Sequence, residues 1–459
     1  MKAIKVILII VAVAIALAII VVGAGIYFAN RYLQSPAFKE QALQAAHNEL
    51  GADVRIDDLK VSLFSGVELR GVTIGNPPGF PGNLVTANAF ALRYRLLPLL
   101  SRRVEIEELS LDKLVITLSQ NARGEWNYEK VGAPETQTKP APITSPPTTP
   151  SPAAAAKSGK TVPLDIVLSK LAITQGAVSM VSDSNKPLVK LEGISFSSSV
   201  SLTGNKLAGS GKAGIDKIDL SEKLFVEKVT TLVQLGSDRV ALQSLRGELA
   251  GGAVSGDVSV NFGTGLEYAV SVQLTNSDVA RLLQDAGTKQ VISGKLNVMT
   301  SMHGTGGVPT IIGNGRVEID NGKLMEVPLL NLLATLLQVD ALRDLSFDQC
   351  LLEYSISNNV MQTPMIRLTS PQIQIDGRGS MSLSDYTLNH NMTLIFAKGA
   401  LDRAPDAIRG LFAEQTDGSL TLNFKVTGPY NSPKTDLAKR VAQSLGHQLL
   451  EKGLQKLLR

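Results

Sequence analysis

The chain has 459 residues, of which 44% are hydrophobic and only 5% aromatic, so any core that it forms is mainly aliphatic. Its net charge of +4 equals the excess of basic over acidic residues between Lys434 and Arg459, and no basic stripe runs through the body, which argues against a nucleic-acid-binding protein. The single cysteine, Cys350, excludes an internal disulfide and a multi-cysteine metal site, and its apolar flanks predict a small core residue.

The first element is an uncharged apolar run from Val6 to Phe28. As a helix it would be about 35 Å long, enough to cross a hydrocarbon core of about 30 Å. It is too long for the hydrophobic region of a signal peptide and no small-residue cleavage site follows it, so we expect a permanent transmembrane anchor over residues 6–28. Basic residues flank it equally and do not set its orientation. We expect residues 1–5 in the cytoplasm and the bulk of the chain on the far side, because long downstream domains translocate largely regardless of charge.

Residues 29–131 begin with a short helix and continue as strands. A serine-proline start and a glycine stop predict a helix over Ala37–Leu50. From Val54 onwards apolar residues alternate with polar ones, which predicts strands that have one apolar and one solvated face. Turn sequences separate these strands, among them NPPG at 76–79 and NARG at 121–124.

Residues 132–162 interrupt the alternation with low-complexity sequence. Seven prolines lie between Pro134 and Pro152, beside threonines, serines and a run of alanines. This composition cannot bury a core, so we expect a Pro/Ala/Thr-rich linker or loop. The sequence leaves open whether it is a hinge between two β-bodies or a loop on one.

Alternating strands resume over residues 163–433, interrupted by predicted helices at 276–286 and 328–337. A soft repeat of glycine, alternating apolar residues and a Gly/Asn/Asp turn indicates an elongated architecture. Residues 434–459 predict a basic amphipathic helix. Either this helix packs against the end of the sheet with its basic face in solvent, or it contacts anionic lipid headgroups or a membrane partner through Lys439, Arg440, Lys452 and Lys456.

Motifs that carry catalytic or cofactor chemistry are weak in this chain. A GxGxxG at residues 209–214 lacks the following helix that a dinucleotide site requires, and we interpret it as a glycine-rich hairpin connection. Glu107 and Glu108 are neighbours in a strand and should face opposite sides of it. The four histidines are scattered, so we expect no metal and no cofactor. A polysaccharide-processing enzyme would need paired carboxylates and stacking aromatics, yet Trp126 is the only tryptophan, so we predict no catalytic residues and no enzyme.

Several segments together resemble the AsmA family of Gram-negative envelope proteins. The similar parts are one N-terminal membrane helix and a short helix, followed by DVRIDDLKVSLFSGVELRGVTIGNPPGF at 53–80. Residues 92–131 then match the family's strand, its "pLL" turn at Pro98-Leu99-Leu100 and its "rn-x-G-x-x-N" signature at Asn121, Gly124 and Asn127. The C-terminal part is also similar, at 313–337, 368–383 and 426–437.

The resemblance implies an inner-membrane anchor with a periplasmic body, and a fold similar to bridge-like lipid-transfer proteins. Together with the alternation it predicts a mainly β fold. We expect an elongated, twisted antiparallel sheet curled into an open groove, an N-terminal transmembrane helix and a few short helices, including the C-terminal one. Larger members of the family are implicated in moving phospholipid towards the outer membrane, and smaller members are linked to outer-membrane assembly.

An uncovered apolar sheet face of this size would promote aggregation unless it closes on itself or holds a ligand. Acyl chains would cover such a face through apolar contacts alone and would need no specific polar contacts. For each residue, packing within the sheet is the alternative to lipid contact, and the groove-lining candidates are Val61, Leu63, Leu69, Ile106, Leu111, Ile116, Val258, Val260, Val270 and Val272.

Two functions follow from these predictions. The first is binding or conduction of phospholipid acyl chains between the inner and outer membranes, with phospholipids and the inner membrane as partners. The second is a non-conducting scaffold that assists outer-membrane protein assembly, with an outer-membrane or envelope protein as partner. Lipid bound to the purified protein would separate the two.

Overall fold

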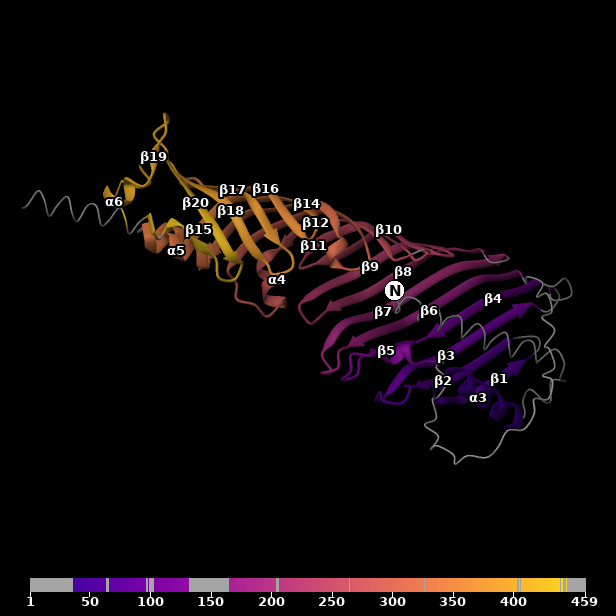
Figure 1. Ribbon diagram of the computed structural model, residues 1–459. Helices are drawn as coiled ribbons and strands as arrows, with labels where there is room; N and C mark the ends of the chain where they lie inside the picture. The colour runs from indigo at the N-terminus through magenta and orange to yellow at the C-terminus, as the bar shows by residue number, and fades with distance from the viewer. Residues whose placement is uncertain are drawn as a thin grey trace, which may run out of the picture. The chain divides into compact units, whose positions relative to one another are not determined.

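The computed structural model describes residues 36–443 apart from 63–65, 96–97, 99–102, 132–164, 204–205, 264, 326, 338, 403, 405, 438 and 441–442. The described residues form two compact units. Unit 1 runs to Asp216 and includes Val233–Ser237; unit 2 comprises Lys217–Leu232 and the chain from Asp238 onwards. Both are built mainly from β-strands, which Figure 1 shows as twisted ribbons. The prediction of a mainly β fold with few short helices is therefore confirmed.

The elements follow the chain in this order: α3 (Pro36–Leu50), β1 (Val54–Ser62), β2 (Gly66–Gly75), β3 (Asn83–Arg95), β4 (Arg103–Asp112), β5 (Val115–Ser119), the 3-10 helix η2 (Asn127–Glu129), β6 (Asp165–Val181), β7 (Pro187–Thr203), β8 (Lys206–Leu220), β9 (Leu224–Gly236), β10 (Arg239–Leu249), β11 (Gly252–Asn261), β12 (Glu267–Asp278), α4 (Val279–Asp285), β13 (Ile292–Thr305), η3 (Val308–Thr310), β14 (Ile312–Met325), α5 (Pro328–Leu337), η4 (Asp340–Leu342), β15 (Asp344–Ser357), β16 (Val360–Thr369), β17 (Ile373–Ser382), β18 (Thr387–Phe396), α6 (Asp406–Arg409), β19 (Ala413–Glu414), β20 (Leu420–Pro429) and β21 (Lys434–Thr435).

Unit 1 corrects the expectation of an antiparallel sheet. Strands β1 to β4 pair antiparallel in sequence order, but β6 pairs parallel with both β4 and β5, so the sheet is mixed. Parallel neighbours need a long crossover connection, and the chain between β5 and β6 is long enough to provide one. The predicted linker, residues 132–162, falls in this connection and lies outside the described residues. It joins two strands that pair within one unit.

Unit 2 contains an antiparallel meander. From β10 to β18 each strand pairs with the next in the chain, and β20 and β21 extend the order from β18. In a meander successive connections alternate between the two ends of the strands. The connections that contain α4, α5 and α6 follow β12, β14 and β18, which run in the same direction, so these connections leave from the same end of the strands; Figure 1 labels the three helices.

A side-chain contact of the same kind recurs at two β-bulges of unit 2. At the β-bulges of β10 and β12, the backbone N–H of Ser244 donates to Asp257 Oδ1, and that of Asn276 donates to Asn297 Oδ1, each at 2.9 Å. Both bulged residues have positive φ. Bulges bend a strand and increase its twist. The Asp or Asn of the neighbouring strand therefore stabilises each bend.

The predicted helices are largely confirmed. α3 and α5 match their predicted ranges within one residue, and α3 ends before Gly51, whose φ of +60° suits the helix stop. α4 starts three residues later than predicted, because 276–278 complete β12 and Asp278 caps the helix by accepting from the backbone N–H of Arg281.

The membrane anchor predicted over residues 6–28 lies outside the described residues, as does most of the C-terminal helix predicted over 434–459. Lys434 and Thr435 form strand β21, so the predicted start of that helix was wrong. Within the described chain the longest helix has 15 residues, and none combines the length and apolarity needed to cross a bilayer.

The glycine-rich motif at 209–214 lies inside strand β8, so our interpretation as a hairpin connection was wrong. A Cβ on Gly211 would stand 2.3 Å from the carbonyl oxygen of Ser197 and 2.6 Å from Ser198 Cβ. The glycine therefore permits a close backbone approach within the sheet, which local sequence pattern does not distinguish from a turn.

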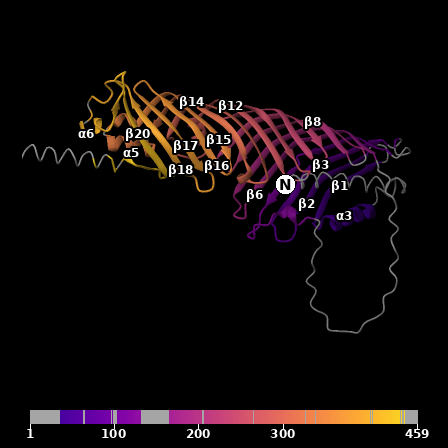
Figure 2. The same ribbon diagram turned by 45° about the horizontal axis from the view of Figure 1, so that its top comes forward.

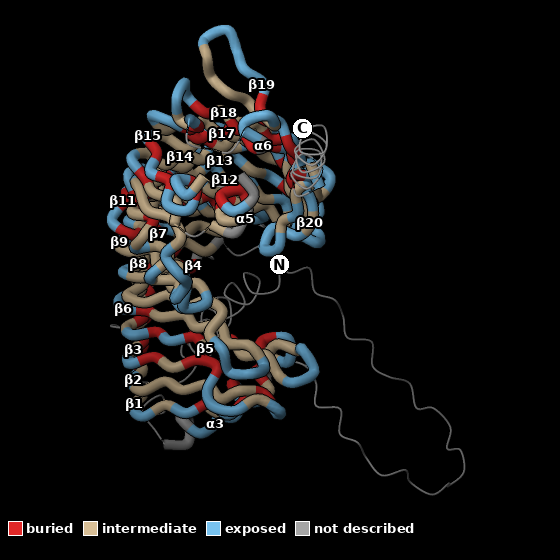
Figure 3. Tube along the Cα trace, turned by 90° about the vertical axis from the view of Figure 1, so that its left-hand side faces the viewer, coloured by how far each residue is buried: buried red, intermediate tan, exposed pale blue. Residues whose placement is uncertain are grey.

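Each unit has its own buried hydrophobic cluster. The cluster of unit 1 draws on β1 to β6, and that of unit 2 on α5, η4 and strands β15 to β20. Figure 3 shows buried stretches both in β1–β5 and around β15–β18 and α6.

Candidate functional site

Four of the predicted groove residues come together on one face of β11 and β12 in unit 2. Val258 lies opposite Val270, and Val260 and Val272 are each two residues further along their strands, so all four side chains share this face. The alternation predicted this arrangement, and the register confirms it. Leu242 on β10 and Met302 on β13 extend the same row to both sides. We call the apolar side of β10–β13 the open apolar face.

The open apolar face is only partly covered. The side chains of Val258, Val260, Val270 and Val272 are half-buried. Among the described residues, β10, β11 and β12 contribute nothing to the hydrophobic clusters, and of the hydrophobic side chains of this face on β11 and β12 only Val254 and Leu274 are buried. Because contiguous uncovered apolar surface costs free energy in water, this face is a candidate ligand surface.

Two tyrosines lie over glycines on this side of the sheet. A Cβ on Gly304 would stand 2.6 Å from the Tyr268 hydroxyl, and a Cβ on Gly315 would stand 2.4 Å from that of Tyr354. Each ring thus occupies the space above a glycine on the neighbouring strand. The Tyr354 hydroxyl also lies 2.9 Å from Thr300 Oγ1. Sequence reasoning missed this pattern, although a glycine at an inward position of a strand was its available signal.

The opposite face is polar and ion-paired. Arg316 on β14 contacts Glu318 at 3.2 Å and Glu353 on β15 at 3.5 Å. Lys295 lies 3.3 Å from Asp278, whose pKa is lowered chiefly by the backbone N–H that Arg281 donates to it and also by Lys295. Such pairs are exposed and contribute little stability. They do make the two faces of the sheet chemically distinct.

The candidates in unit 1 also share one face but lie in a closed core. Leu69 pairs with Phe90, and Phe90 with Leu111, in a single cross-strand row. Val61, Ile106, Leu111 and Ile116 are at most 8% exposed and belong to the unit 1 cluster, with Leu69 packed against it. Leu63 lies outside the described residues. Lipid contact by any of the ten candidates stays a prediction.

Of the basic candidates, Arg440 has a defined contact. Its guanidinium donates to the carbonyl oxygen of Asn423 on β20 and lies 3.9 Å from Asp436. Asp436 Oδ1 in turn accepts the backbone N–H of Lys425 at 2.8 Å. These two side chains satisfy backbone groups along β20 beyond the short pairing with β21, and so cap the edge of the sheet. Lys439 is exposed, and Lys452 and Lys456 lie outside the described residues.

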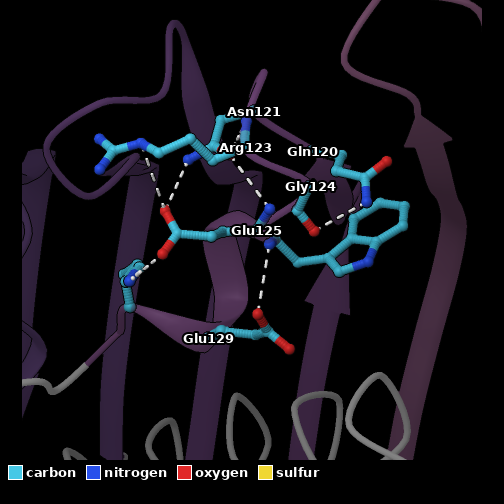
Figure 4. Close-up of polar contacts among 8 residues, drawn as sticks. Gln120, Asn121, Arg123, Gly124, Glu125 and Glu129 are labelled. Atoms are coloured by element: carbon cyan, nitrogen blue, oxygen red, sulfur yellow. Dashed lines mark hydrogen bonds and ion pairs between the residues drawn. The ribbon is translucent and has the colours of Figure 1, made fainter.

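The turn after β5 holds a cluster of polar side chains (Figure 4). Glu125 accepts from Asn121 Nδ2 at 3.0 Å and from Lys130 Nζ at 2.8 Å, and its pKa is lowered chiefly by the hydrogen bond from Lys130. Asn121 Oδ1 accepts the backbone N–H groups of Arg123 and Glu125. These hydrogen bonds therefore use the polar groups of the cluster to stabilise the turn.

Asn127 explains why the two N-terminal motifs occur together. Its side chain is fully buried and donates to Asn76 Oδ1 at 2.7 Å and to the carbonyl oxygen of Thr117 at 2.8 Å. Its Oδ1 accepts the backbone N–H groups of Ser119 and Tyr128. With its hydrogen-bonding capacity used, Asn127 joins the NPPG turn to β5 as a structural residue.

The prediction that Glu107 and Glu108 face opposite sides was wrong. The β3–β4 register shifts at this point, so both carboxylates lie on the polar face. Glu107 accepts from Arg95 Nε at 2.6 Å, and Glu108 accepts from Lys170 Nζ at 2.7 Å. Both carboxylates are therefore ion-paired rather than arranged around a substrate.

Cys350 behaves as predicted for a small packed residue. It faces Ile319 and Leu368 on the neighbouring strands and packs against the unit 2 cluster. Burial raises the pKa of its thiol to about 11. Among the described residues, no group of three histidine, cysteine or carboxylate side chains is arranged to hold a metal ion.

These observations define a class of protein: a two-faced β-sheet protein with an apolar face in unit 2 that the described residues cover only in part. The chain belongs to the AsmA family, whose family model matches residues 1–234 and 212–366. The matches overlap and span most of the chain. No curated protein and no solved structure matches the chain.

Proposed function

We propose that this protein binds phospholipid acyl chains on the open apolar face of β10–β13, as a membrane-anchored component of the cell envelope. The observation that carries the proposal is the row of half-buried aliphatic side chains that no hydrophobic cluster of the described chain covers. Membership of the AsmA family and the dominance of β-sheet support an envelope or lipid-transport role.

The dimensions of the face suit an acyl chain. From Leu296 to Gly304, β13 advances eight residues, which is about 27 Å along the strand at about 3.4 Å per residue. One leaflet of a bilayer is about 15 Å of hydrocarbon, half of the full core. A fully extended acyl chain of that size therefore fits along one strand. Each methylene transferred from water contributes about 0.8 kcal/mol without any directional contact.

The side chains of the face match this ligand. Valine, leucine and methionine offer apolar contact. The two tyrosines fill the space above glycines, so the face offers no recess there for a ligand of fixed shape. In contrast, the polar groups around Glu125, Asn127 and Arg316 are occupied by internal hydrogen bonds and ion pairs. Binding, rather than catalysis, is the chemistry that these side chains support.

Photo-crosslinking in living cells tests the proposal with a matched pair of positions. Benzoylphenylalanine at Val270 faces the proposed ligand, whereas at Ser271 it faces the polar side one residue away. After irradiation and purification of the full chain, mass spectrometry should find phospholipid adducts at position 270 and not at 271. Equal adducts at both positions, or none at either, would overturn the proposal. Protein adducts without lipid at 270 would favour the scaffold function.

A further inference from the structure

A depression of about 620 Å³ lies on the polar face of unit 2, opposite the apolar side. Its floor spans β17, β18 and β20. Pro364 and Met365 line it on the β16 side, at a bulge in the β16–β17 pairing, and Asp436 lines it on the side of the capped edge. Pro364 has no backbone N–H to donate to the ladder, which accounts for a bulge at this point.

One cross-strand row of this floor is internally neutral. Arg367 Nε lies 2.9 Å from Asp376 Oδ1, and Thr393 Oγ1 donates to Asn423 Oδ1 at 2.7 Å. The other carboxylate of the depression, Asp436, accepts the backbone N–H of Lys425 and lies beside Arg440. Both acidic groups of the depression are thus already matched.

The adjacent row is not neutral. Arg378 on β17 faces Asn391 on β18, which faces Lys425 on β20. All three side chains are exposed, and within the described residues neither cation has an ion-pair partner. Strands two places apart are separated by about 10 Å, a span that the long side chains of arginine and lysine can close from both sides. The central amide adds N–H donors between them.

We propose that Arg378, Asn391 and Lys425 form a binding site for a phosphate group. Arginine presents a planar pair of donors that matches phosphate oxygens, and lysine supplies a compact positive charge. The phosphate is either that of an anionic phospholipid headgroup or a free phosphate, since both present the same oxygens. The site is separate from the acyl-binding face and stands whether or not that face binds lipid.

The experiment uses the full chain in detergent, with inorganic phosphate in one arm and short-chain dihexanoyl phosphatidylglycerol in the other. Binding is measured by titration calorimetry at constant ionic strength, with sodium chloride as the blank. We expect saturable binding in at least one arm and at least a tenfold loss of affinity in the Arg378→Gln/Lys425→Gln double variant. Binding in the lipid arm alone assigns a headgroup. Binding of inorganic phosphate alone assigns a free phosphate.

The matched control is Arg246→Gln, which removes an exposed cation from β10. It should leave the affinity unchanged, and thermal unfolding should show that all variants fold as the parent does. No saturable binding in either arm would overturn the site. An equal loss in the control and the double variant would also overturn it, because it would show a general charge effect.

Discussion

Two parts of the same sheet in unit 2 carry the same alternation but differ in burial. One apolar row runs in register through successive strands, from the open apolar face towards the C-terminal strands: Leu274, Val298, Val317, Leu352 and Ile366. On β11 and β12 the apolar residues are mostly half-buried, whereas Leu394 on β18 is 0% exposed and Leu422 on β20 is 1% exposed. The strands themselves do not account for this difference.

The difference comes from the connections. α5 lies beside β20 in Figures 1 and 2, and Leu333 and Ala334 of this helix, each 1% exposed, join the same cluster as Leu394 and Leu422. The chain thus supplies aliphatic side chains of α5 to the cluster on β15–β20, whereas the described residues of β10–β12 join no hydrophobic cluster, although Val254 and Leu274 are buried. An apolar strand face is therefore a core or a binding surface according to what the connecting segments place on it.

The largest expected effect is on stability, and it separates the two parts. Leu333→Ala should lower the free energy of unfolding by about 3 kcal/mol, since truncation of a buried leucine leaves a cavity. Val272→Ala on the open apolar face should cost about 1 kcal/mol or less, because its surroundings are already partly solvated. Urea unfolding of the two variants measures this contrast. Equal losses would show that the open apolar face is packed as tightly as the covered part.

The second prediction breaks the open apolar face without unfolding it. Val260→Asp places a charge among half-buried aliphatic side chains, so co-purifying phospholipid should fall at least tenfold while the thermal unfolding midpoint changes little. Ser259→Asp, one residue away on the polar face, is the control and should retain the lipid. Full lipid binding by Val260→Asp would contradict the proposed function.

The third prediction concerns the tyrosine that lies over a glycine. Gly315→Ala forces the ring of Tyr354 to move, and we expect a loss of about 1–3 kcal/mol in unfolding free energy. At Gly265 a Cβ would meet nothing within 4 Å, so Gly265→Ala is the matched substitution and should be close to neutral. Chemical denaturation measures both changes. A neutral Gly315→Ala would show that the ring moves aside without cost.

The smallest effect is a pH dependence in the covered part. His390 is 6% exposed, hydrogen-bonded to Thr363 at 2.7 Å, and faces the uncharged Gly379 and Val426; burial lowers its pKa below the usual 6.5. The unfolded chain therefore binds a proton that the folded chain resists, so stability should fall as the pH drops below about 6.5, by at most about 1.4 kcal/mol per pH unit.

Unfolding measured from pH 7.5 to 5 in the parent and in His390→Asn checks this slope. The variant should lose that part of it. His303→Asn, which changes an exposed histidine, should retain it. A slope that is the same in all three proteins would assign the pH dependence to other groups.

Local pattern predicted a large part of this molecule. α5 begins and ends where its apolar run does, and the shared face of Val258 and Val270 follows from residue spacing alone. The pattern did not predict that β6 pairs with β4, because the sequence of a strand does not specify which distant strand it pairs with. It also misplaced Glu107, since a bulge shifts every later side chain to the other face. Nor does alternation report whether a helix such as α5 covers a given strand.

The parallel pairing in unit 1 also constrains the order in which this chain folds. Arg103 on β4 pairs with Asp165 on β6. The backbone groups on this edge of β4 therefore stay unpaired until 62 further residues of the chain have been made. The hairpins of unit 2 whose connections contain no helix need only a few residues to close, and closing a longer loop costs more entropy. During synthesis the edges of β4 and β5 therefore stay unpaired longer than most. Those edges are where premature pairing with another chain would begin, and where a folding helper would be needed first.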